Sequence, residues 1–393
     1  MYHLNDLGML CTLGSSPAEV AASLLDSENP VPEPETLFAS RGSYRVGQIH
    51  TRLTKLPTQL ANYNCRNNRL AATALDQIRP AVDRAANKWG RDRVGVVMAT
   101  STSGIHATEE AVLRVLEAGS HPDSYHAYQG MLGGLGDFSA NYLGLTGPTY
   151  TISTACSSSA NAALSARRLL TAGLCDAVVF GGVDSLCEMT LQGFGSLEAQ
   201  SAHLNMPLSV NRDGINIGEA AAIFLMSSEA KGPVLAGGCA SSDAHHISAP
   251  HPEGDGAYQA MSGALRDAGL APEQIGYINL HGTATRQNDS MESKAVSRLF
   301  PKSVPCSSSK SMTGHTLGAA GALELGFCWL LLQTDGPTRL PPALYQEEVD
   351  PALPLLHLAN AEAMEATPAY CLSNSFAFGG SNVSLIIGRL DER

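Results

Sequence analysis

The sequence has little basic charge, and this limits the partners that it can have. Its 393 residues include 25 Lys and Arg against 37 Asp and Glu, a formal net charge of −12. General binding to nucleic acid needs a basic surface, so we do not expect that function. No apolar run approaches the roughly 18–20 residues of a membrane span, and the N-terminus lacks the basic start and apolar stretch of a signal peptide.

The cysteines lack any pattern that would indicate a structural role. Nine are scattered along the chain, and none forms a Cys-x-x-Cys pair. We therefore predict neither a disulfide framework nor a zinc site, and we expect no bound metal or cofactor. These absences are together typical of a soluble protein of the reducing cytoplasm.

Hydrophobic residues are plentiful, at 44% of the chain, which is enough for a large core built as two fused units. Short apolar segments alternate with helical patterns almost throughout, and this predicts an α/β fold with buried sheets. The predicted strands are Val94–Ala99, Tyr150–Ser153, Ala177–Gly181, Ala222–Met226, Val234–Gly238, Ile275–Leu280, Val304–Ser307 and Val383–Gly388. The predicted helices include Ala160–Leu170, Ala257–Ala268, Met291–Leu299 and Leu317–Leu332.

The two halves of the chain repeat one pattern weakly. A strand, a small polar cluster with Ser-Ser-Ser and a helix occur at residues 150–170 and again at 304–332. This repeat indicates an internal duplication. Residues 227–233 have the composition of a surface junction, so we predict one unit over residues 1–230 and a second over residues 231–393.

Cys156 is the first candidate for a catalytic residue. It lies in a run of small residues between an apolar strand and a helix. Unpaired N–H groups and the positive end of the helix dipole favour a thiolate there, and a thiolate is a nucleophile. Because most cysteines in arbitrary sequences are only structural, this prediction needs partners elsewhere in the chain.

Two histidine segments supply such partners. His281 ends an apolar strand, at a position where active sites form in open α/β sheets, and His315 lies with Lys310 in a Gly-rich turn before a helix that carries Glu324. A thiolate with two imidazoles suggests covalent acyl chemistry in which Nε2–H groups stabilise an enolate oxygen. A cysteine hydrolase would need one histidine only, so the second favours carbon–carbon bond formation, although spacing alone does not decide between them.

Four motifs in one order connect these residues to a known family: Thr-Ala-Cys at 154–156, His-Gly-Thr-Ala-Thr at 281–285, Lys-Ser-Met-Thr-Gly-His at 310–315 and Phe-Gly-Gly at 378–380. With them the sequence resembles the β-ketoacyl-acyl-carrier-protein synthases, the condensing enzymes of fatty acid and polyketide synthesis, over nearly its whole length. His315 fits the elongating Cys-His-His branch and not the initiating Cys-His-Asn branch. The resemblance implies a thiolase-like five-layered αβαβα fold of two duplicated halves, in a homodimer or a heterodimer.

The resemblance also implies catalytic roles. Cys156 would accept the acyl chain as a thioester, while His281 and His315 would promote decarboxylation of a malonyl thioester and stabilise the resulting enolate. Lys310 would orient His315 and tune its protonation, and Glu324 would support that network.

Further residues would bind the substrate. The backbone N–H groups of Cys156 and Phe378 would form an oxyanion hole, and Phe378 matches the family's gating position. Thr283 and Thr285 would hydrogen-bond the phosphopantetheine arm of acyl carrier protein, which carries the substrate.

Carrier docking is expected at Arg66 and Arg69, which match one basic docking element of the family. The alternative is that they are only surface charges on a helix. Other basic positions of the family are lost at residues 119–124 and 196–200, which points to a dedicated carrier or a partner subunit. Since carrier protein is acidic, a chain of net charge −12 needs such a local basic patch.

Two positions depart from the family's elongating enzymes. Ile215 stands where they often carry Phe. Thr108 stands roughly where they carry a bulky apolar residue, unless the alignment slips by one position. A more polar acyl pocket would suit an unsaturated or aryl-capped chain, but fatty acid synthesis and a specialised polyene or polyketide pathway both remain open.

Other interpretations are weaker. A non-catalytic chain-length partner subunit usually lacks the nucleophile, and a degradative thiolase that used Cys371 would show Cys-x-Gly near its end. The histidines at 245, 246 and 251 lack a further ligand at suitable spacing, so we expect an entrance loop there and not a metal site. Asp289 and Glu292 are expected to anchor the loop of His281.

Overall fold

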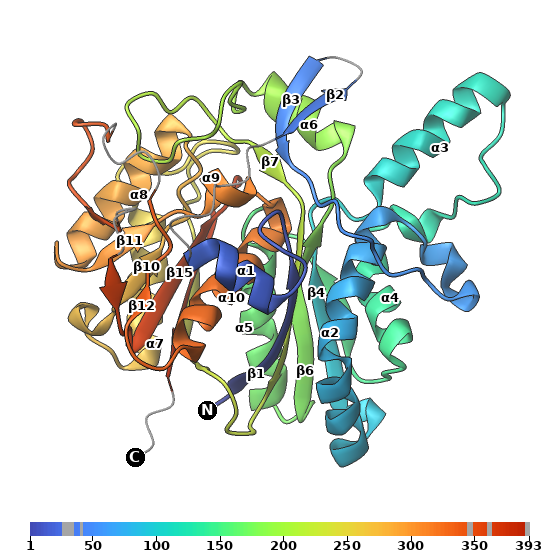
Figure 1. Cartoon of the computed structure of the whole chain (residues 1–393), viewed down its shortest axis with the longest axis horizontal. Helices are drawn as coiled ribbons and strands as arrows, with labels where there is room; N and C mark the ends of the chain where they lie inside the picture. The colour runs from blue at the N-terminus through green and yellow to red at the C-terminus, as the bar shows by residue number, and fades with distance from the viewer. Residues whose placement is uncertain (26–34, 40–41, 344–348, 360–363, 390–393) are drawn as a thin grey trace.

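The computed structural model describes residues 1–25, 35–39, 42–343, 349–359 and 364–389 (Figure 1). An 11-stranded sheet runs through this part of the chain in the order β13-β11-β10-β15-β16-β9-β1-β8-β6-β4-β5. Its strands are β1 (His3–Leu10), β4 (Val94–Ala99), β5 (Thr149–Ile152), β6 (Ala177–Asp184), β8 (Ala220–Ser227), β9 (Val234–Ser242), β10 (Tyr277–Asn279), β11 (Pro305–Ser307), β13 (His357–Leu358), β15 (Tyr370–Phe376) and β16 (Ser381–Gly388). Smaller sheets join β2 (Glu35–Ala39), β3 (Gly42–Gly47) and β7 (Ile217–Gly218), and β12 (Thr338–Arg339) with β14 (Glu365–Ala366).

One strand order occurs twice in the large sheet. In the N-terminal part, β1 pairs with β8 and β8 with β6, both antiparallel, and β4 and β5 follow in parallel. In the C-terminal part, β9, β16, β15, β10 and β11 follow each other with the same directions. The two parts join where β1 pairs with β9. This repeat confirms the duplicated halves, while the division at residue 230 stays a prediction.

Helices cover both faces of the strands and separate the two halves (Figure 1). On one side, α2 (Arg66–Trp89) and α4 (Gly134–Leu143) contact the N-terminal strands, and on the other α7 (Asp255–Ala268) covers β9 and β16 with α8 (Arg286–Leu299) beside it. Between the halves lie α5 (Ser158–Thr171) and α10 (Ala320–Gln333), which contact each other and strands of both parts. The α, β, α, β, α layering confirms the predicted fold. The remaining helices are α1 (Pro17–Leu25), α3 (Ile105–Ala118), α6 (Glu188–Ser196) and α9 (Lys310–Thr313).

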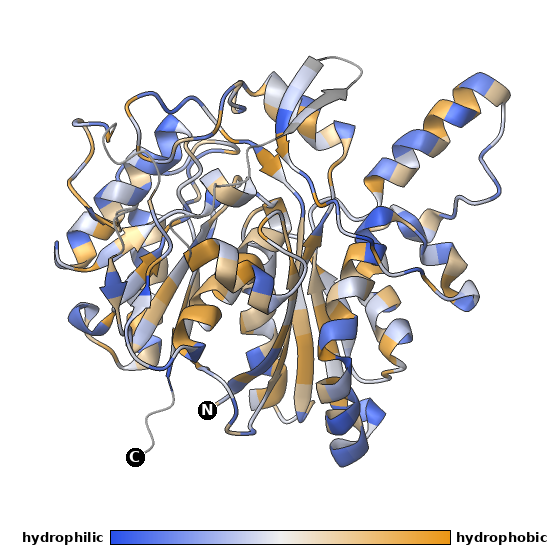
Figure 2. Ribbon diagram, viewed as in Figure 1, coloured by the Kyte–Doolittle hydropathy of each residue, from blue (hydrophilic) through white to orange (hydrophobic). Residues whose placement is uncertain are grey.

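Small residues let the two central helices approach each other. A Cβ added at Gly321 of α10 would lie 2.8 Å from the backbone nitrogen of Ala160 in α5, closer than real Cβ atoms come. Nearly every residue of α10 is buried, as expected for a helix that is apolar on all sides. Figure 2 shows apolar residues along the central strands and hydrophilic ones over the lower turns of α2. Within the described residues, no helix is both long and apolar enough to cross a membrane.

Candidate active site

Cys156 lies in the turn between β5 and α5 and lines a cavity of about 460 Å³. The preceding residue, Ala155, has a φ of +50°, which is unfavourable for a residue with a Cβ. Strained turns of this kind persist where surrounding structure fixes them, often at functional sites. The turn delivers the thiol into the cavity two residues before α5 begins at Ser158.

His315 occupies the corresponding place in the second half, after β11, the strand equivalent to β5. Its backbone N–H donates to the carbonyl of Asn216 at 2.6 Å, and its carbonyl accepts from the N–H of Gly218 at 3.0 Å. The N-terminal half therefore fixes this histidine. Its Nε2 lies 2.9 Å from Sγ of Cys156, so the sequence-distant pair is in direct contact.

His281 follows β10 and is anchored by a carboxyl group on α8. Glu292 accepts from the backbone N–H of His281 at 2.8 Å and from that of Gly282 at 2.7 Å. Asp289 accepts from the N–H of Ala284, so both carboxyls anchor this loop as predicted.

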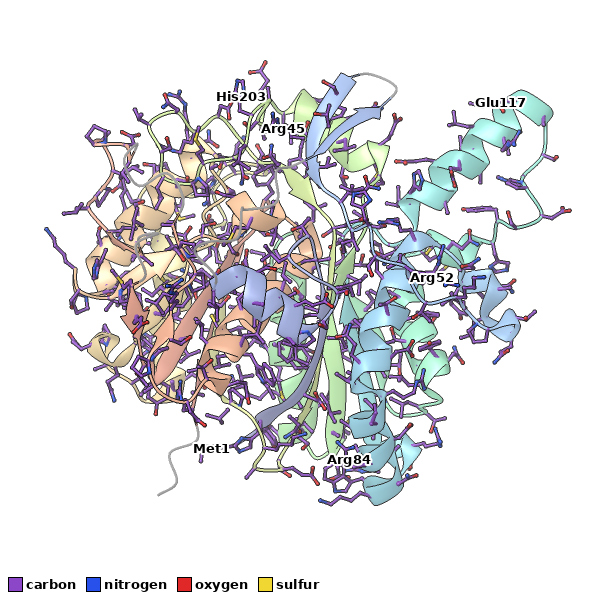
Figure 3. The ribbon with its side chains drawn as sticks, in the orientation of Figure 1. Met1, Arg45, Arg52, Arg84, Glu117 and His203 are labelled. Carbon is purple, nitrogen blue, oxygen red and sulfur yellow. The ribbon has the colours of Figure 1, made fainter. Side chains whose placement is uncertain are left out.

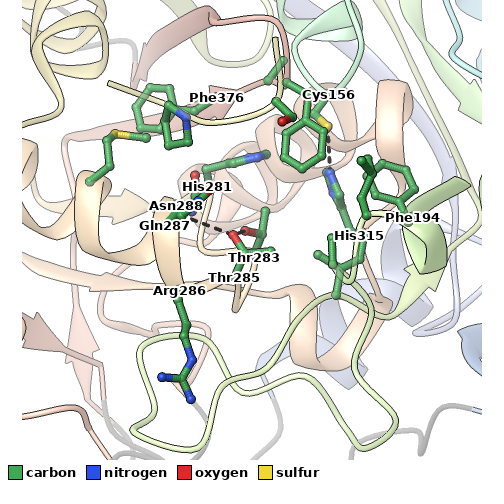
Figure 4. Close-up of a pocket in the computed structure, with 18 of the residues that line it drawn as sticks. Cys156, Phe194, His281, Thr283, Thr285, Arg286, Gln287, Asn288, His315 and Phe376 are labelled. Atoms are coloured by element: carbon green, nitrogen blue, oxygen red, sulfur yellow. Dashed lines mark hydrogen bonds between the residues drawn. The ribbon is translucent and has the colours of Figure 1, made fainter. Parts of the chain in front are cut away.

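The three predicted catalytic side chains converge. The rings of His281 and His315 lie 5.3 Å apart at 83°, and the sulfur of Cys156 and one nitrogen of each ring all lie within 4.8 Å of one another (Figure 4). All three residues are buried. The expectation that no resident metal occupies this group stays an expectation.

Lys310 contacts His281 and not His315. Its Nζ donates to the carbonyl of His281 at 2.5 Å, lies 3.5 Å from Nδ1 of the same residue and forms a buried ion pair with Glu324. The sequence prediction assigned Lys310 to the orientation of His315. The structure differs because β10 and α9 bring the ammonium next to His281. On His315 only the charge of Lys310 acts, and it adds to the larger effect of burial in lowering the pKa of that ring.

Burial sets the protonation of the group. It raises the pKa of Cys156 to about 12, partly offset by the charge of Lys310 and by the N–H of Phe378, which donates to the sulfur. Burial, together with Lys310, holds the pKa of both His281 and His315 well below 6.5. The resting group is therefore a thiol beside neutral imidazoles. The sequence had suggested a thiolate produced by the helix N-terminus. In the structure, the neutral imidazole of His315 lies beside the thiol and can accept its proton.

The other predicted substrate-binding residues line the same cavity. Thr283 and Thr285 do so with their hydroxyl oxygens 3.0 Å apart, and Ile215 forms part of the wall. The ring of Phe378 lies 5.6 Å from that of Phe194 on α6. The roles assigned to these residues stay predictions.

Three of the residues predicted to bind substrate or carrier lie outside the lining of this cavity. The guanidinium of Arg66 is committed to the buried carboxylate of Glu219, and Arg69 donates to the carbonyl of Thr54 at 3.4 Å. Thr108 shares a hydrogen bond of 3.2 Å with the hydroxyl of Tyr125. Their assignments to carrier docking and to the acyl pocket stay predictions.

Sequence reasoning missed several residues of the site. Phe194, Glu198, Asp213 and Arg286 line the cavity. Arg286 directly follows the His-Gly-Thr-Ala-Thr motif, and Asp213 lies two residues before Ile215, so these two positions had a signal nearby. Asp184 was missed as well: it accepts from the N–H groups of residues 101, 102 and 319 and so ties the end of β4 to the start of α10. Its position at the end of an apolar strand was the available signal.

Comparison with known proteins agrees with this geometry. The family model "Beta-ketoacyl synthase, N-terminal domain" matches residues 68–231, and "Beta-ketoacyl synthase, C-terminal domain" matches residues 233–344. The chain is 33% identical over 318 residues to 3-oxoacyl-[acyl-carrier-protein] synthase 2 of Synechocystis sp., covering 76% of each chain. It is 32% identical over 348 residues to the enzyme of that name from Staphylococcus aureus, covering 83% of each.

Solved structures are similar over the whole chain. One is the ketosynthase ApeO in complex with its chain length factor ApeC from Xenorhabdus doucetiae, with 44% identity, a TM-score of 0.94, and coverage of 99% of this chain and 98% of that chain. Another is the ishigamide ketosynthase/chain length factor, with 26% identity, a TM-score of 0.88 and coverage of 99% of both. Sequence, fold and pocket agree, and the chain belongs to the β-ketoacyl synthase family of the thiolase superfamily, as an acyltransferase.

Proposed function

We propose that the chain catalyses the decarboxylating Claisen condensation of an acyl chain held on Cys156 with malonyl-acyl carrier protein, giving a 3-oxoacyl-carrier. The contact of 2.9 Å between Sγ of Cys156 and Nε2 of His315, with His281 beside it in a buried cavity, carries this proposal. One imidazole at the thiol is enough for acyl transfer, and the second provides the additional donor that an enolate needs.

In the first half-reaction, the sulfur of Cys156 attacks the carbonyl carbon of the carrier-bound acyl thioester while its proton passes to Nε2 of His315. The carbon–sulfur bond to the carrier arm breaks, and the departing sulfur takes up one proton. The acyl chain is then a thioester of Cys156, and the carrier leaves with a free thiol. The N–H groups of Cys156 and Phe378 stabilise the oxyanion.

In the second half-reaction, the bond between the methylene carbon and the carboxylate of a malonyl thioester breaks, and carbon dioxide leaves. The electron pair forms an enolate, whose oxygen accepts from the Nε2–H groups of His281 and His315. The methylene carbon attacks the Cys156 thioester, the carbon–sulfur bond breaks, and the cysteine sulfur takes up one proton. The 3-oxoacyl product remains on the carrier arm.

The hydrogen bonds to the two rings suit these roles. Because the ammonium of Lys310 faces Nδ1 of His281, that nitrogen acts as acceptor and the ring proton lies on Nε2. Nδ1 of His315 has no hydrogen-bond partner in the described part of the chain, so either nitrogen of this ring can carry the proton. His315 can thus accept a proton in the first half-reaction and donate one in the second.

A second ketosynthase-like subunit fits an exposed apolar face of this chain. Helix α3 projects from the body of the molecule, and Glu117 near its far end extends into solvent (Figures 1 and 3). Leu113, Leu116 and Met131 on and beside it are 58%, 78% and 52% exposed. Nearby, β5 ends the sheet and pairs only with β4 among the described strands, and such an edge is suited to pairing with another chain.

That subunit is a copy of this chain or a related one. The ApeO and ishigamide structures contain a ketosynthase with a chain length factor, and identity is higher to a chain of the ApeO–ApeC complex, at 44%, than to the Synechocystis enzyme, at 33%. This favours a ketosynthase that works with a chain length factor in a specialised pathway over one of fatty acid synthesis.

The same structures give a basis for the alternative that this chain is itself a non-catalytic chain length factor. Against it, the thiol of Cys156 and both imidazoles are present and in contact. Release of carbon dioxide from malonyl-carrier decides between the two. We expect release and condensation by the native chain, and release without condensation by Cys156→Ala; a native chain that releases none is not a condensing enzyme.

A further inference from the structure

Arg286 is the one permanently cationic side chain among the described residues that line the catalytic cavity. It is the first residue of α8 and is exposed. Its guanidinium makes no hydrogen bond or ion pair with any residue that the structure describes. Asp350 attracts it only at longer range and is itself held by Arg212 at 2.7 Å. A cation in the wall of a binding cavity is therefore available to a ligand.

The rest of the cavity would repel an anion. Its lining includes two exposed carboxylates, Glu198 and Asp213, while His281 and His315 are held neutral by burial. Only Arg286 offsets this negative charge. A guanidinium also presents a fork of donors that matches the oxygens of a phosphate.

The direction of the Arg286 side chain indicates which end of the substrate it would meet. In Figure 4, Arg286 points away from Cys156 and the two histidines, and Thr283 and Thr285 lie between it and that group. A phosphopantetheine arm that places its thioester at Cys156 runs outward past these hydroxyls. Its single charged group, the phosphate, stands at the end farthest from the sulfur.

We propose that Arg286 binds the phosphate of the phosphopantetheine arm and so determines the preference of this pocket for phosphorylated thioester donors. The inference rests on the proposed function, because it requires a pantetheine thioester to reach Cys156. The guanidinium, the pair of threonine hydroxyls and the thiol then form one track that matches the arm from its phosphate to its sulfur.

The test compares two donors that differ only in the phosphate, malonyl-4′-phosphopantetheine and malonyl-pantetheine, after acylation of Cys156 by one common acyl donor. For Arg286→Gln we expect kcat/KM to fall about tenfold, or about 1.4 kcal/mol, with the phosphorylated donor and to stay unchanged with the other. Added salt should shrink the difference. Arg168→Gln is the matched control, since Arg168 is an exposed arginine outside the cavity lining.

A fall of equal size with both donors, or no fall with either, overturns the proposal. Binding of 4′-phosphopantetheine and of pantetheine, measured by calorimetry, tests it without catalysis. Weaker binding of the phosphorylated compound alone by Arg286→Gln supports the site, and equal binding by native and variant protein refutes it. A native protein that condenses neither donor refutes the proposed function instead, and calorimetry still decides the role of Arg286.

Discussion

Replacing Glu292 by Gln should make the protein gain stability relative to the native chain as pH rises, while it impairs the active site. The carboxyl is buried, and burial raises its pKa from 4.5 to about 7 even though the N–H groups of His281 and Gly282 donate to it. Between these two values the folded protein holds the proton more tightly than the unfolded chain does. The free energy of unfolding therefore falls as pH rises through this window.

The size of the effect follows from the two pKa values. One pKa unit corresponds to about 1.4 kcal/mol, so titration of this carboxyl lowers the free energy of unfolding by about 1 kcal/mol at pH 5 and about 3 kcal/mol at pH 8, relative to a pH at which it is protonated in both states. Glutamine does not titrate. Relative to the native chain, Glu292→Gln should gain about 2–3 kcal/mol of unfolding free energy between pH 5 and pH 8.

Urea unfolding of both proteins at pH 5, 6, 7 and 8 measures this difference, with Glu273→Gln as the control because Glu273 is exposed. If the difference in unfolding free energy between native protein and Glu292→Gln did not change with pH, this would falsify the raised pKa of the buried Glu292 carboxyl. Decarboxylation of malonyl-carrier should fall in the same variant, since an amide offers one oxygen to two backbone donors and His281 loses part of its anchor.

Three further predictions concern packing, charge and acid stability. Gly321→Ala should lose about 1–3 kcal/mol through overpacking against α5, measured by urea unfolding, whereas Gly193→Ala, with open space around it, should not. Arg66→Gln should lower the free energy of unfolding by about 3 kcal/mol, because it leaves the buried carboxylate of Glu219 unpaired. Arg69→Gln should alter only the KM for carrier. Burial lowers the pKa of His315, so below pH 6.5 this histidine is protonated in the unfolded chain before it is protonated in the folded protein. Acid should therefore lower the unfolding free energy of native protein more than that of His315→Gln, by up to about 1.4 kcal/mol per pH unit. Equal acid sensitivity of the two proteins would contradict a buried neutral ring.

The predicted Glu292 trade-off has a general physical origin. A carboxyl at this depth costs stability, and a core built for stability alone would carry an apolar or amide group there. The loop after β10 nevertheless needs two acceptors for its paired N–H groups if His281 is to face the thiol. Stability is therefore given up where the chemistry needs a precise backbone position.

The sequence alone determined the elements whose signal is local. The strand predicted at Val94–Ala99 is β4 with the same limits, and the predicted helix Ala257–Ala268 lies within α7. Runs of β-branched residues and helical periodicity act over a few residues, so they are readable without a partner. β1, β15 and the long helix α2 were missed, because their mixed polar and apolar residues acquire a buried face only after the halves pack together.

The motifs likewise determined which atoms do the chemistry, since nucleophile, imidazoles and lysine are fixed by residue type and order. Only the tertiary structure decided how they meet: Cys156 and His315 touch although 159 positions separate them, because α5 and α10, the helices that follow them, pack against each other between the two halves. It also decided that Lys310 serves His281, that the resting sulfur keeps its proton, and that Arg286 faces the cavity. Contact, burial and charge depend on neighbours that are remote in sequence, and packing alone brings those neighbours together.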